Sequence, residues 1–142
     1  MNILIIHGPN LHLLGVRKKE IYGNFTLKEL NRKIKEFALK NKIQAKIYQS
    51  NSEGEIIDII TKNIKWADFI IINPGAYTHY SYAIRDCIEA VNIPTIEVHI
   101  SDITKRENFR KRSVIKDVCI KQIYGKGIES YIEALKFCLN EK

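Results

Sequence analysis

FIIINPGAYTH at residues 69–79 joins a continuous apolar run to a turn that is rich in proline, glycine and polar side chains. An apolar run without alternation is typical of a strand that is covered on both faces of its sheet. ILII at residues 3–6 has the same character and leads into the turn HGPN at residues 7–10. These two units predict two central strands with polar loops at the ends where the strands stop.

The remaining strands and helices alternate along the chain. Residues 43–48 alternate between apolar and polar, which is typical of a strand near a sheet edge, and residues 94–98 and 118–123 are rich in β-branched side chains. Apolar residues at helical spacing predict helices over residues 27–38, 56–64, 82–90 and 128–139. Strand and helix therefore alternate about five times. This pattern predicts an α/β fold, a flavodoxin-like doubly wound five-stranded parallel sheet with strand order 2-1-3-4-5.

Two capping boxes mark the starts of the first two predicted helices. Thr26 is followed three residues later by Glu29, and Ser52 by Glu55. In such a box the hydroxyl oxygen accepts a hydrogen bond from a backbone N–H that the helix itself leaves free. Both pairs therefore favour helices that begin directly after Thr26 and Ser52.

Length and composition limit the class of protein. With 142 residues, 45% of them hydrophobic, the chain is predicted to form one globular domain over residues 1–142. Its formal net charge of +7 favours anionic partners without choosing between a small carboxylate and a nucleic acid. The three cysteines form no CxxC pair, and no apolar run reaches the length of a signal-peptide core or a membrane span. We therefore expect a soluble, cytoplasmic domain.

Polar side chains collect where the predicted strands end. His7, His79 and His99 all follow strands, so they are expected at one edge of the sheet, where ligands bind in such folds. Glu97 lies two positions before His99 and therefore points to the same face of its strand, where its carboxylate can orient the imidazole. Turn formation explains the glycines and prolines at this edge, but it does not explain the histidines.

Residues 14–23, here called the lid loop, form an unusually long connection between a strand and a helix. Loops of this kind often close over active sites. The lid loop carries Arg17 and Tyr22, which pattern alone would assign to solvated positions.

Several blocks together resemble the type II 3-dehydroquinate dehydratase family. They are HGPNL at 7–11, LGVR at 14–17, YG at 22–23, NPGAYTH at 73–79, IRD at 84–86, EVHIS at 97–101 and FR at 109–110. The match extends from about residue 3 to residue 135 with the blocks in the right order. The resemblance implies a lyase of the shikimate pathway that converts 3-dehydroquinate to 3-dehydroshikimate and water. It implies no metal, no organic cofactor and no Schiff-base lysine.

The resemblance also implies a role for each matching catalytic residue. Tyr22 would remove a proton from the carbon next to the ketone, with Arg17 beside it to favour the phenolate. Asn10 would hold a water that stabilises the enolate oxygen. His99 would protonate the departing hydroxyl, oriented by Glu97.

Substrate-binding positions carry over in the same way. Asn73 and the backbone N–H groups of Ile100 and Ser101 would hold the substrate carboxylate. His79 and Arg110 would hold ring hydroxyls. The family assembles as a dodecamer built from trimers, and Asp86 would reach in from a neighbouring subunit.

The chain departs from the family pattern mainly in the lid loop. Lys18 and Lys19 stand where the family commonly has Glu-Pro, so we expect this loop to be more mobile and more sensitive to salt. Tyr80 stands where a small hydroxyl residue is frequent. None of these departures touches a matching catalytic position.

Competing interpretations were a metal site, nucleic-acid binding and a non-catalytic module. The four histidines could hold zinc in principle, but no cysteine or helix-spaced pair supports such a site. The basic run Lys105, Arg106, Arg110, Lys111 and Arg112 is interpreted as a solvated helical face, because no aromatic interleaving accompanies it; only Arg110 is set apart, by the resemblance. The alternative function is a flavodoxin-like module that binds an anionic ligand or nucleic acid without catalysis.

Overall fold

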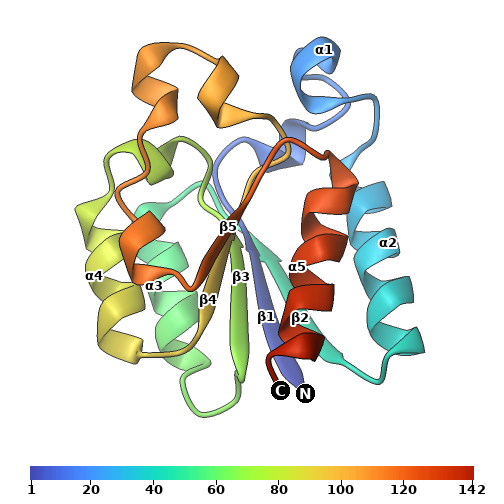
Figure 1. The fold of residues 1–142 in the computed structure, drawn as a ribbon, viewed down its shortest axis with the longest axis vertical. Helices are drawn as coiled ribbons and strands as arrows, with labels where there is room; N and C mark the ends of the chain where they lie inside the picture. The colour runs from blue at the N-terminus through green and yellow to red at the C-terminus, as the bar shows by residue number, and fades with distance from the viewer.

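The computed structural model describes all residues, 1–142, and contains one five-stranded parallel sheet (Figure 1). The strands are β1 (Asn2–His7), β2 (Gln44–Gln49), β3 (Phe69–Asn73), β4 (Thr95–Val98) and β5 (Lys121–Ile123). They pair in the order β2-β1-β3-β4-β5, and each pair is parallel. The predicted fold class and strand order are therefore confirmed, and the two strands with continuous apolar runs, β1 and β3, lie inside the sheet.

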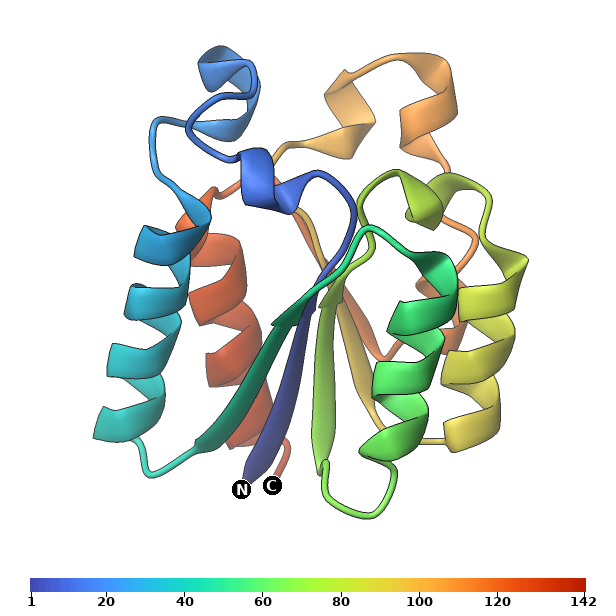
Figure 2. The same cartoon turned by 180° about the vertical axis from the view of Figure 1, so that it is seen from behind.

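Helices cover both faces of the sheet. They are α1 (Lys19–Tyr22), α2 (Leu27–Lys40), α3 (Glu53–Lys62), α4 (Tyr82–Val91) and α5 (Ile128–Asn140). Figures 1 and 2 show α2 and α5 on one face and α3 and α4 on the other. Short 3₁₀ turns occupy the connections: η1 (Leu11–Leu13), η2 (Gly75–His79), η3 (Ile103–Lys105), η4 (Asn108–Lys111) and η5 (Lys116–Val118).

The core explains the continuous apolar runs of β1 and β3. Ile3 and Ile5 of β1 point into the cluster under α2 and α5, whereas Leu4 and Ile6 point into the cluster under α3 and α4. All four side chains are completely buried. A strand with a helical layer on each side has no solvent-facing position, so the residues along its middle are apolar on both faces.

Both predicted capping boxes are confirmed at their N-terminal residue. The Thr26 hydroxyl accepts a hydrogen bond from the backbone N–H of Glu29, and the Ser52 hydroxyl accepts one from that of Glu55, both at 3.2 Å. These bonds satisfy donors that the first turn of a helix leaves free. They fix where α2 and α3 begin.

Two predicted boundaries were wrong. The last strand was expected over residues 118–123, but β5 is only Lys121–Ile123, because residues 116–118 form η5 instead. The second helix was expected to include Ile64, but α3 ends at Lys62 and Ile64 is exposed in the turn that follows. In both segments apolar side chains occur next to a turn, where their pattern cannot mark the end of an element.

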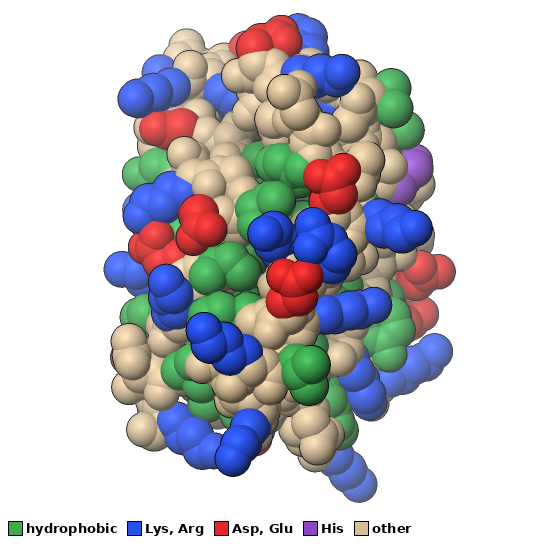
Figure 3. Space-filling model, turned by 90° about the vertical axis from the view of Figure 1, so that its right-hand side faces the viewer, with side chains coloured by type: hydrophobic (Ala, Val, Ile, Leu, Met, Phe, Trp, Pro, Cys, Tyr) green, Lys and Arg blue, Asp and Glu red, His purple; other side chains and the backbone are tan.

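The segments above the carboxyl ends of the strands form the functional edge of the molecule. In Figure 1, α1 lies above this edge on one side and the orange segment with η3 and η4 on the other, while both termini lie at the opposite edge. Figure 3 shows the face formed by α2 and α5, where Lys and Arg side chains are spread among acidic and apolar ones. No helix is both long and apolar enough to cross a bilayer.

Candidate active site

A cavity of about 110 Å³ opens at the carboxyl ends of β1, β3 and β4. It unites nine of the eleven predicted site residues: Asn10, Arg17, Tyr22, Asn73, His79, His99, Ile100, Ser101 and Arg110. Glu97 lies behind the cavity, fully buried, and Asp86 does not line it. The topology therefore brings residues from widely separated parts of the sequence to one pocket, as expected at this edge of a doubly wound sheet.

Tyr22 lies inside the cavity and is only 9% exposed, so its assignment to a solvated loop position was wrong. Its hydroxyl oxygen accepts hydrogen bonds from Nη2 of Arg17 and from Nη1 of Arg106, each at 2.7 Å. The guanidinium carbon of Arg17 also lies 3.7 Å from the centre of the Tyr22 ring. Two positive groups on one phenol oxygen stabilise negative charge on that oxygen.

Arg106 is a functional candidate that the sequence analysis missed. It was assigned to a solvated basic face, but its guanidinium reaches into the cavity and also donates to the Ser101 hydroxyl at 3.3 Å. Its Nε is buried and has no hydrogen-bond partner in the chain. A buried donor without an acceptor is costly, and a polar ligand in the cavity would supply one.

The cationic groups around Tyr22 also act on one another. Burial lowers the pKa of Arg17; the charge of Tyr22 opposes this shift, and repulsion from Arg106 and Arg110 adds to it. A second pocket shares Arg17, Arg106 and Arg110 with the cavity and is also lined by Lys18 and the acidic Glu107. Positive side chains outnumber the single acidic one there, so this region attracts anions.

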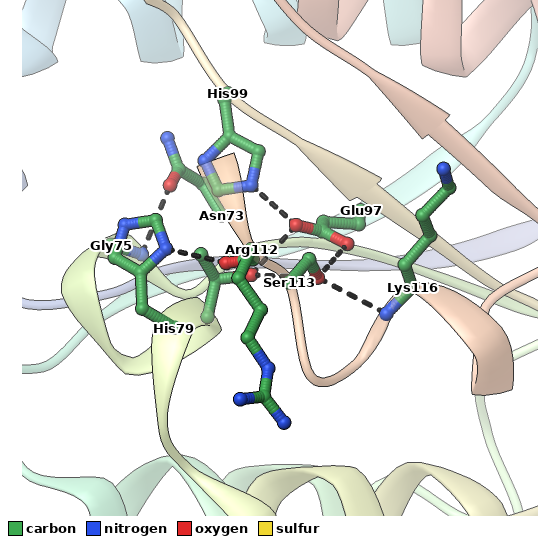
Figure 4. Close-up of polar contacts among 9 residues, drawn as sticks. Asn73, Gly75, His79, Glu97, His99, Arg112, Ser113 and Lys116 are labelled. Atoms are coloured by element: carbon green, nitrogen blue, oxygen red, sulfur yellow. Dashed lines mark hydrogen bonds and ion pairs between the residues drawn. The ribbon is translucent and has the colours of Figure 1, made fainter. Parts of the chain in front are cut away.

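The imidazole of His99 is held from behind by Glu97, as the sequence predicted (Figure 4). His99 Nε2 and Glu97 Oε2 are 2.5 Å apart, and both side chains are nearly or completely buried. The other ring nitrogen, Nδ1, has no partner in the chain and is not sealed from the cavity. His99 therefore offers one nitrogen to the carboxylate and the other to a ligand.

Two hydroxyl groups complete the surroundings of the Glu97 carboxylate. Thr78 donates to Oε2 at 2.7 Å. Ser113 donates to Oε1 at 2.8 Å (Figure 4). Burial pushes the pKa of Glu97 upward, but the hydrogen bonds from His99, Thr78 and Ser113 outweigh it and hold the pKa below its ordinary value. A carboxylate that receives this many donors remains ionised although no solvent reaches it.

His79 and Arg110 face the cavity from η2 and η4. His79 Nδ1 is 2.7 Å from the backbone oxygen of Arg112, so Nδ1 carries the proton and Nε2 is the acceptor of a neutral ring. Burial lowers the pKa of His79, which favours the neutral form. Arg110 donates through Nε to Glu107 at 2.5 Å, which leaves its terminal nitrogens free. The pair therefore presents an acceptor and donors to a ligand.

A group of donors gathers at the end of β3 and β4. Neither Ile100 nor Ser101 uses its backbone N–H in a hydrogen bond within the chain. Asn73 is 97% buried, and its Oδ1 accepts from the backbone N–H of Gly75 at 3.1 Å, so that its amide nitrogen is the free end. Free N–H groups that converge on one point form a site for an anion such as a carboxylate.

Asn10 and Asp86 complete the predicted set. Asn10 lines the cavity in a left-handed backbone conformation, with φ 68°, and its backbone N–H donates to Asn51 Oδ1 at 3.0 Å. Its side chain makes no hydrogen bond in the chain. Asp86 is exposed on α4. The isolated chain thus brings Asn10 to the pocket and leaves Asp86 outside it.

Thr78, Ser113 and Arg106 were all absent from the predicted site. Thr78 stands inside the motif NPGAYTH, and its place in that motif was the one available signal in the sequence. Ser113 and Arg106 lie in a polar, basic stretch in which no periodicity separates inward from outward side chains. No group of three or more His, Cys, Asp or Glu side chains stands close enough to hold a metal ion.

Comparison with known proteins gives consistent matches over almost the whole chain. The family model described as "Dehydroquinase class II" matches residues 1–139. A "3-dehydroquinate dehydratase" of Caldicellulosiruptor saccharolyticus is 60% identical over 134 residues, covering 94% of this chain and 92% of that protein. Another from Halothermothrix orenii is 53% identical over 138 residues, covering 97% and 93%. The crystal structure of a type II dehydroquinase from Butyrivibrio crossotus is 50% identical and superposes with a TM-score of 0.95 over 96% of each chain.

Proposed function

Because the chain belongs to the class II dehydroquinase family, we propose that it dehydrates 3-dehydroquinate with Tyr22 as the base and His99 as the acid. The family membership makes it a 3-dehydroquinate dehydratase, a hydro-lyase that forms 3-dehydroshikimate and water in the shikimate pathway. The proposal concerns the residues that perform the two proton transfers and those that hold the substrate, over one catalytic domain that spans residues 1–142.

The proton is removed by the phenolate of Tyr22. A free phenol is a poor base at neutral pH, because little of it is ionised. The hydrogen bonds from Arg17 and Arg106 to its hydroxyl oxygen, both 2.7 Å long, favour the ionised form. The phenolate then takes the proton from the carbon next to the ketone, and the electron pair moves onto the ketone oxygen to give an enolate.

The enolate oxygen needs a donor in place before the proton moves. The side chain of Asn10 lines the cavity without a partner in the chain and can bind a water molecule there. That water donates to the oxygen as negative charge develops on it.

The enolate then collapses and expels the hydroxyl group, which His99 protonates so that it leaves as water. The free Nδ1 of His99 lines the cavity, and its Nε2 bonds to the ionised Glu97. A buried carboxylate behind an imidazole stabilises the protonated ring that this step requires. Thr78 and Ser113 keep Glu97 ionised and fixed in position.

The substrate is held by its carboxylate and its ring hydroxyls. The carboxylate is bound by the amide nitrogen of Asn73 and the unpaired backbone N–H groups of Ile100 and Ser101. The acceptor Nε2 of His79 and the free nitrogens of Arg110 bind ring hydroxyls. These contacts place the acidic carbon near Tyr22 and the leaving hydroxyl near His99.

The active assembly is proposed to be a dodecamer built from trimers, in which Asp86 enters a neighbouring subunit's site. The exposure of Asp86 on α4, outside its own chain's cavity, is compatible with that role. Sedimentation should give a species of twelve chains. Inactive Asp86→Ala chains mixed with inactive Tyr22→Phe chains should then regain activity. In the mixed assembly, some sites combine Tyr22 of an Asp86→Ala chain with Asp86 of a neighbouring Tyr22→Phe chain. A stable monomer with full activity would contradict the assembly.

The observation that carries the proposal is the Tyr22 hydroxyl placed between two guanidinium groups inside the cavity. Purified protein mixed with 3-dehydroquinate should develop the ultraviolet absorbance of a conjugated enone acid. That signal should persist after borohydride and chelator treatment, because no Schiff base or metal takes part. Absence of the signal, together with salt-dependent RNA binding, would instead support the non-catalytic module, for which the site geometry gives no separate support.

A further inference from the structure

The second pocket, on the side of Tyr22 that carries Lys18, has no part in the proposed reaction. It has a volume of about 300 Å³ and is formed by the lid loop and by the segment with η3 and η4, which both lie above the carboxyl ends of the strands (Figures 1 and 2). Its lining consists of Arg17, Lys18, Tyr22, Arg106, Glu107 and Arg110. All of these except Lys18 and Glu107 also line the active-site cavity, so the two spaces share a wall.

Positive charge in the second pocket exceeds the negative charge that the chain itself supplies there. Four cationic side chains line the pocket, whereas Glu107 is its one acidic residue and hydrogen-bonds to Arg110. Even with Tyr22 ionised as the proposed base, four positive charges face two negative ones, and two positive charges are left without a partner. Burial, together with repulsion from Arg106 and Arg110, lowers the pKa of Arg17 although the charge of Tyr22 opposes this shift. An anion with two charges would balance the group.

The cationic side chains also have donors to spare. Within the chain, Arg17 donates through Nη2 alone, Arg106 through Nη1 alone and Arg110 through Nε alone. Nε of Arg106 is buried without an acceptor, and Lys18 forms no ion pair. The N–H groups of a guanidinium form a planar fork that matches two oxygens of a phosphate or sulfate group. The pocket therefore suits a small oxyanion.

We propose that the second pocket binds a small oxyanion with two negative charges, of the phosphate or sulfate type, and that the bound anion inhibits the enzyme. The inference rests on the proposed role of Tyr22 as the base. An anion that accepts from the free nitrogens of Arg17 and Arg106 brings negative charge close to the Tyr22 oxygen and offsets the positive charge that favours its ionised form. Fewer sites then hold the phenolate, so kcat falls, while the donors proposed for the substrate carboxylate stay free.

Titration calorimetry with inorganic sulfate tests the site without relying on turnover. The protein is first saturated with a non-reacting ring analogue that keeps the carboxylate, so that the donors proposed for the substrate are occupied. Sulfate should still bind, at one site per chain. Sulfate that binds only when the analogue is absent occupies the substrate's own site, and this result, like an absence of binding, would overturn the inference.

Lys18→Gln removes a cation that lines the second pocket but not the active-site cavity. Lys19→Gln is the matched control, since Lys19 is also an exposed lysine of the lid loop and lines neither space. Lys18→Gln should weaken sulfate binding about fivefold and Lys19→Gln by less than about twofold, because attraction falls with distance and with screening by salt. Equal losses would show that sulfate responds only to the general charge of the loop, against the inference.

Inhibition kinetics test the consequence for catalysis. With saturating 3-dehydroquinate, sulfate should lower kcat about three- to tenfold relative to potassium chloride at the same ionic strength, and Lys18→Gln should need about fivefold more sulfate for the same inhibition. Full recovery of the rate at saturating substrate would show competition at the substrate's own site and overturn the inference. Bound sulfate with unchanged kcat would overturn the inhibitory role. A Tyr22→Phe enzyme with near wild-type turnover would instead remove the proposed base, and calorimetry would still decide whether the anion site exists.

Discussion

The hydroxyl oxygen of Tyr22 lies 2.7 Å from Nη1 of Arg106, although the two residues are 84 positions apart in the sequence. This bond joins the lid loop to the segment that follows β4. It closes one side of the cavity and places a second guanidinium on the phenol oxygen that already contacts Arg17. The same contact thus shapes the pocket and supplies charge to the proposed base.

Arg106→Gln is expected to lower kcat at neutral pH by about 10- to 150-fold. A hydrogen bond to a charged group contributes about 1.5–3 kcal/mol, and about 1.4 kcal/mol corresponds to a factor of ten in rate. Steady-state kinetics of the purified variant at neutral pH measure the effect.

Lys105→Gln is the matched control for Arg106→Gln, since its side chain is 82% exposed and it removes the same charge from the same segment. It should change kcat by less than about twofold, because exposed charges are screened by solvent. Equal losses in the two variants would mean that Arg106 acts only through the general charge of the segment.

Ser113→Ala should lower stability at neutral pH and make stability less dependent on pH in acid. The pKa of Glu97 lies below its ordinary value in the folded protein, so its ionised form stabilises the fold above that ordinary value, and the contribution is lost as pH falls through the folded pKa. Without the Ser113 donor the folded pKa rises toward the ordinary value, so the stability lost on acidification is smaller and the loss is complete at a higher pH. At neutral pH the variant should lose about 1.5–3 kcal/mol, and the difference from wild type should shrink on acidification.

Urea unfolding from about pH 7 to about pH 3 checks this prediction for Ser113. The control is the same substitution in a Glu97→Gln background, where no carboxylate remains to titrate. There the effect of Ser113→Ala should not vary with pH over this range. A pH-dependent difference in that background would assign the effect to some other group.

Gly8→Ala should destabilise the protein and weaken substrate binding together. A Cβ at Gly8 would lie 2.7 Å from the carbonyl carbon of Pro74 and 2.8 Å from the backbone oxygen of Asn73, and neither backbone atom can move away independently. The clash should cost about 1–3 kcal/mol or more and should displace Asn73 from the pocket. Urea unfolding and KM measure the two effects.

Gly54→Ala serves as the control for Gly8→Ala. Its Cβ would meet only the Ser52 hydroxyl, at 3.9 Å, and Gly54 lies within α3. Alanine favours a helix over glycine, so this variant should be more stable by about 0.5–1 kcal/mol with unchanged KM. A Gly8→Ala protein as stable as wild type would show that the ends of β1 and β3 can move apart.

Much of the fold was predictable because it follows from periodicity. Continuous apolar strands, alternating helices and capping hydroxyls are local signals, and the edge at which polar residues gather follows from a parallel sheet. The pairing of Glu97 with His99 was also predictable, because two residues in one strand must share a face.

The site residues that the sequence did not reveal depend on contacts between segments that are far apart in the chain. Arg106 belongs to a run of basic residues, and nothing in the run shows which of its side chains turns toward Tyr22. His7 was predicted at the edge of the sheet, but its burial beside Tyr131 depends on how α5 packs over the end of β1. The sequence did not predict the position of the lid loop either, because the charged and apolar residues of this loop are also compatible with a loop that lies away from the cavity.

Tyr22→Phe tests the proposed chemistry most directly, because it removes one oxygen and leaves the ring packed in the cavity. Turnover of 3-dehydroquinate, followed by enone absorbance, should fall by about 10²–10⁴-fold, the range expected when a general base is lost. Titration with a non-reacting ring analogue that keeps the carboxylate should show binding within a few fold of wild type. A Tyr22→Phe enzyme that keeps more than about a tenth of the wild-type kcat, while binding the analogue normally, would contradict Tyr22 as the base.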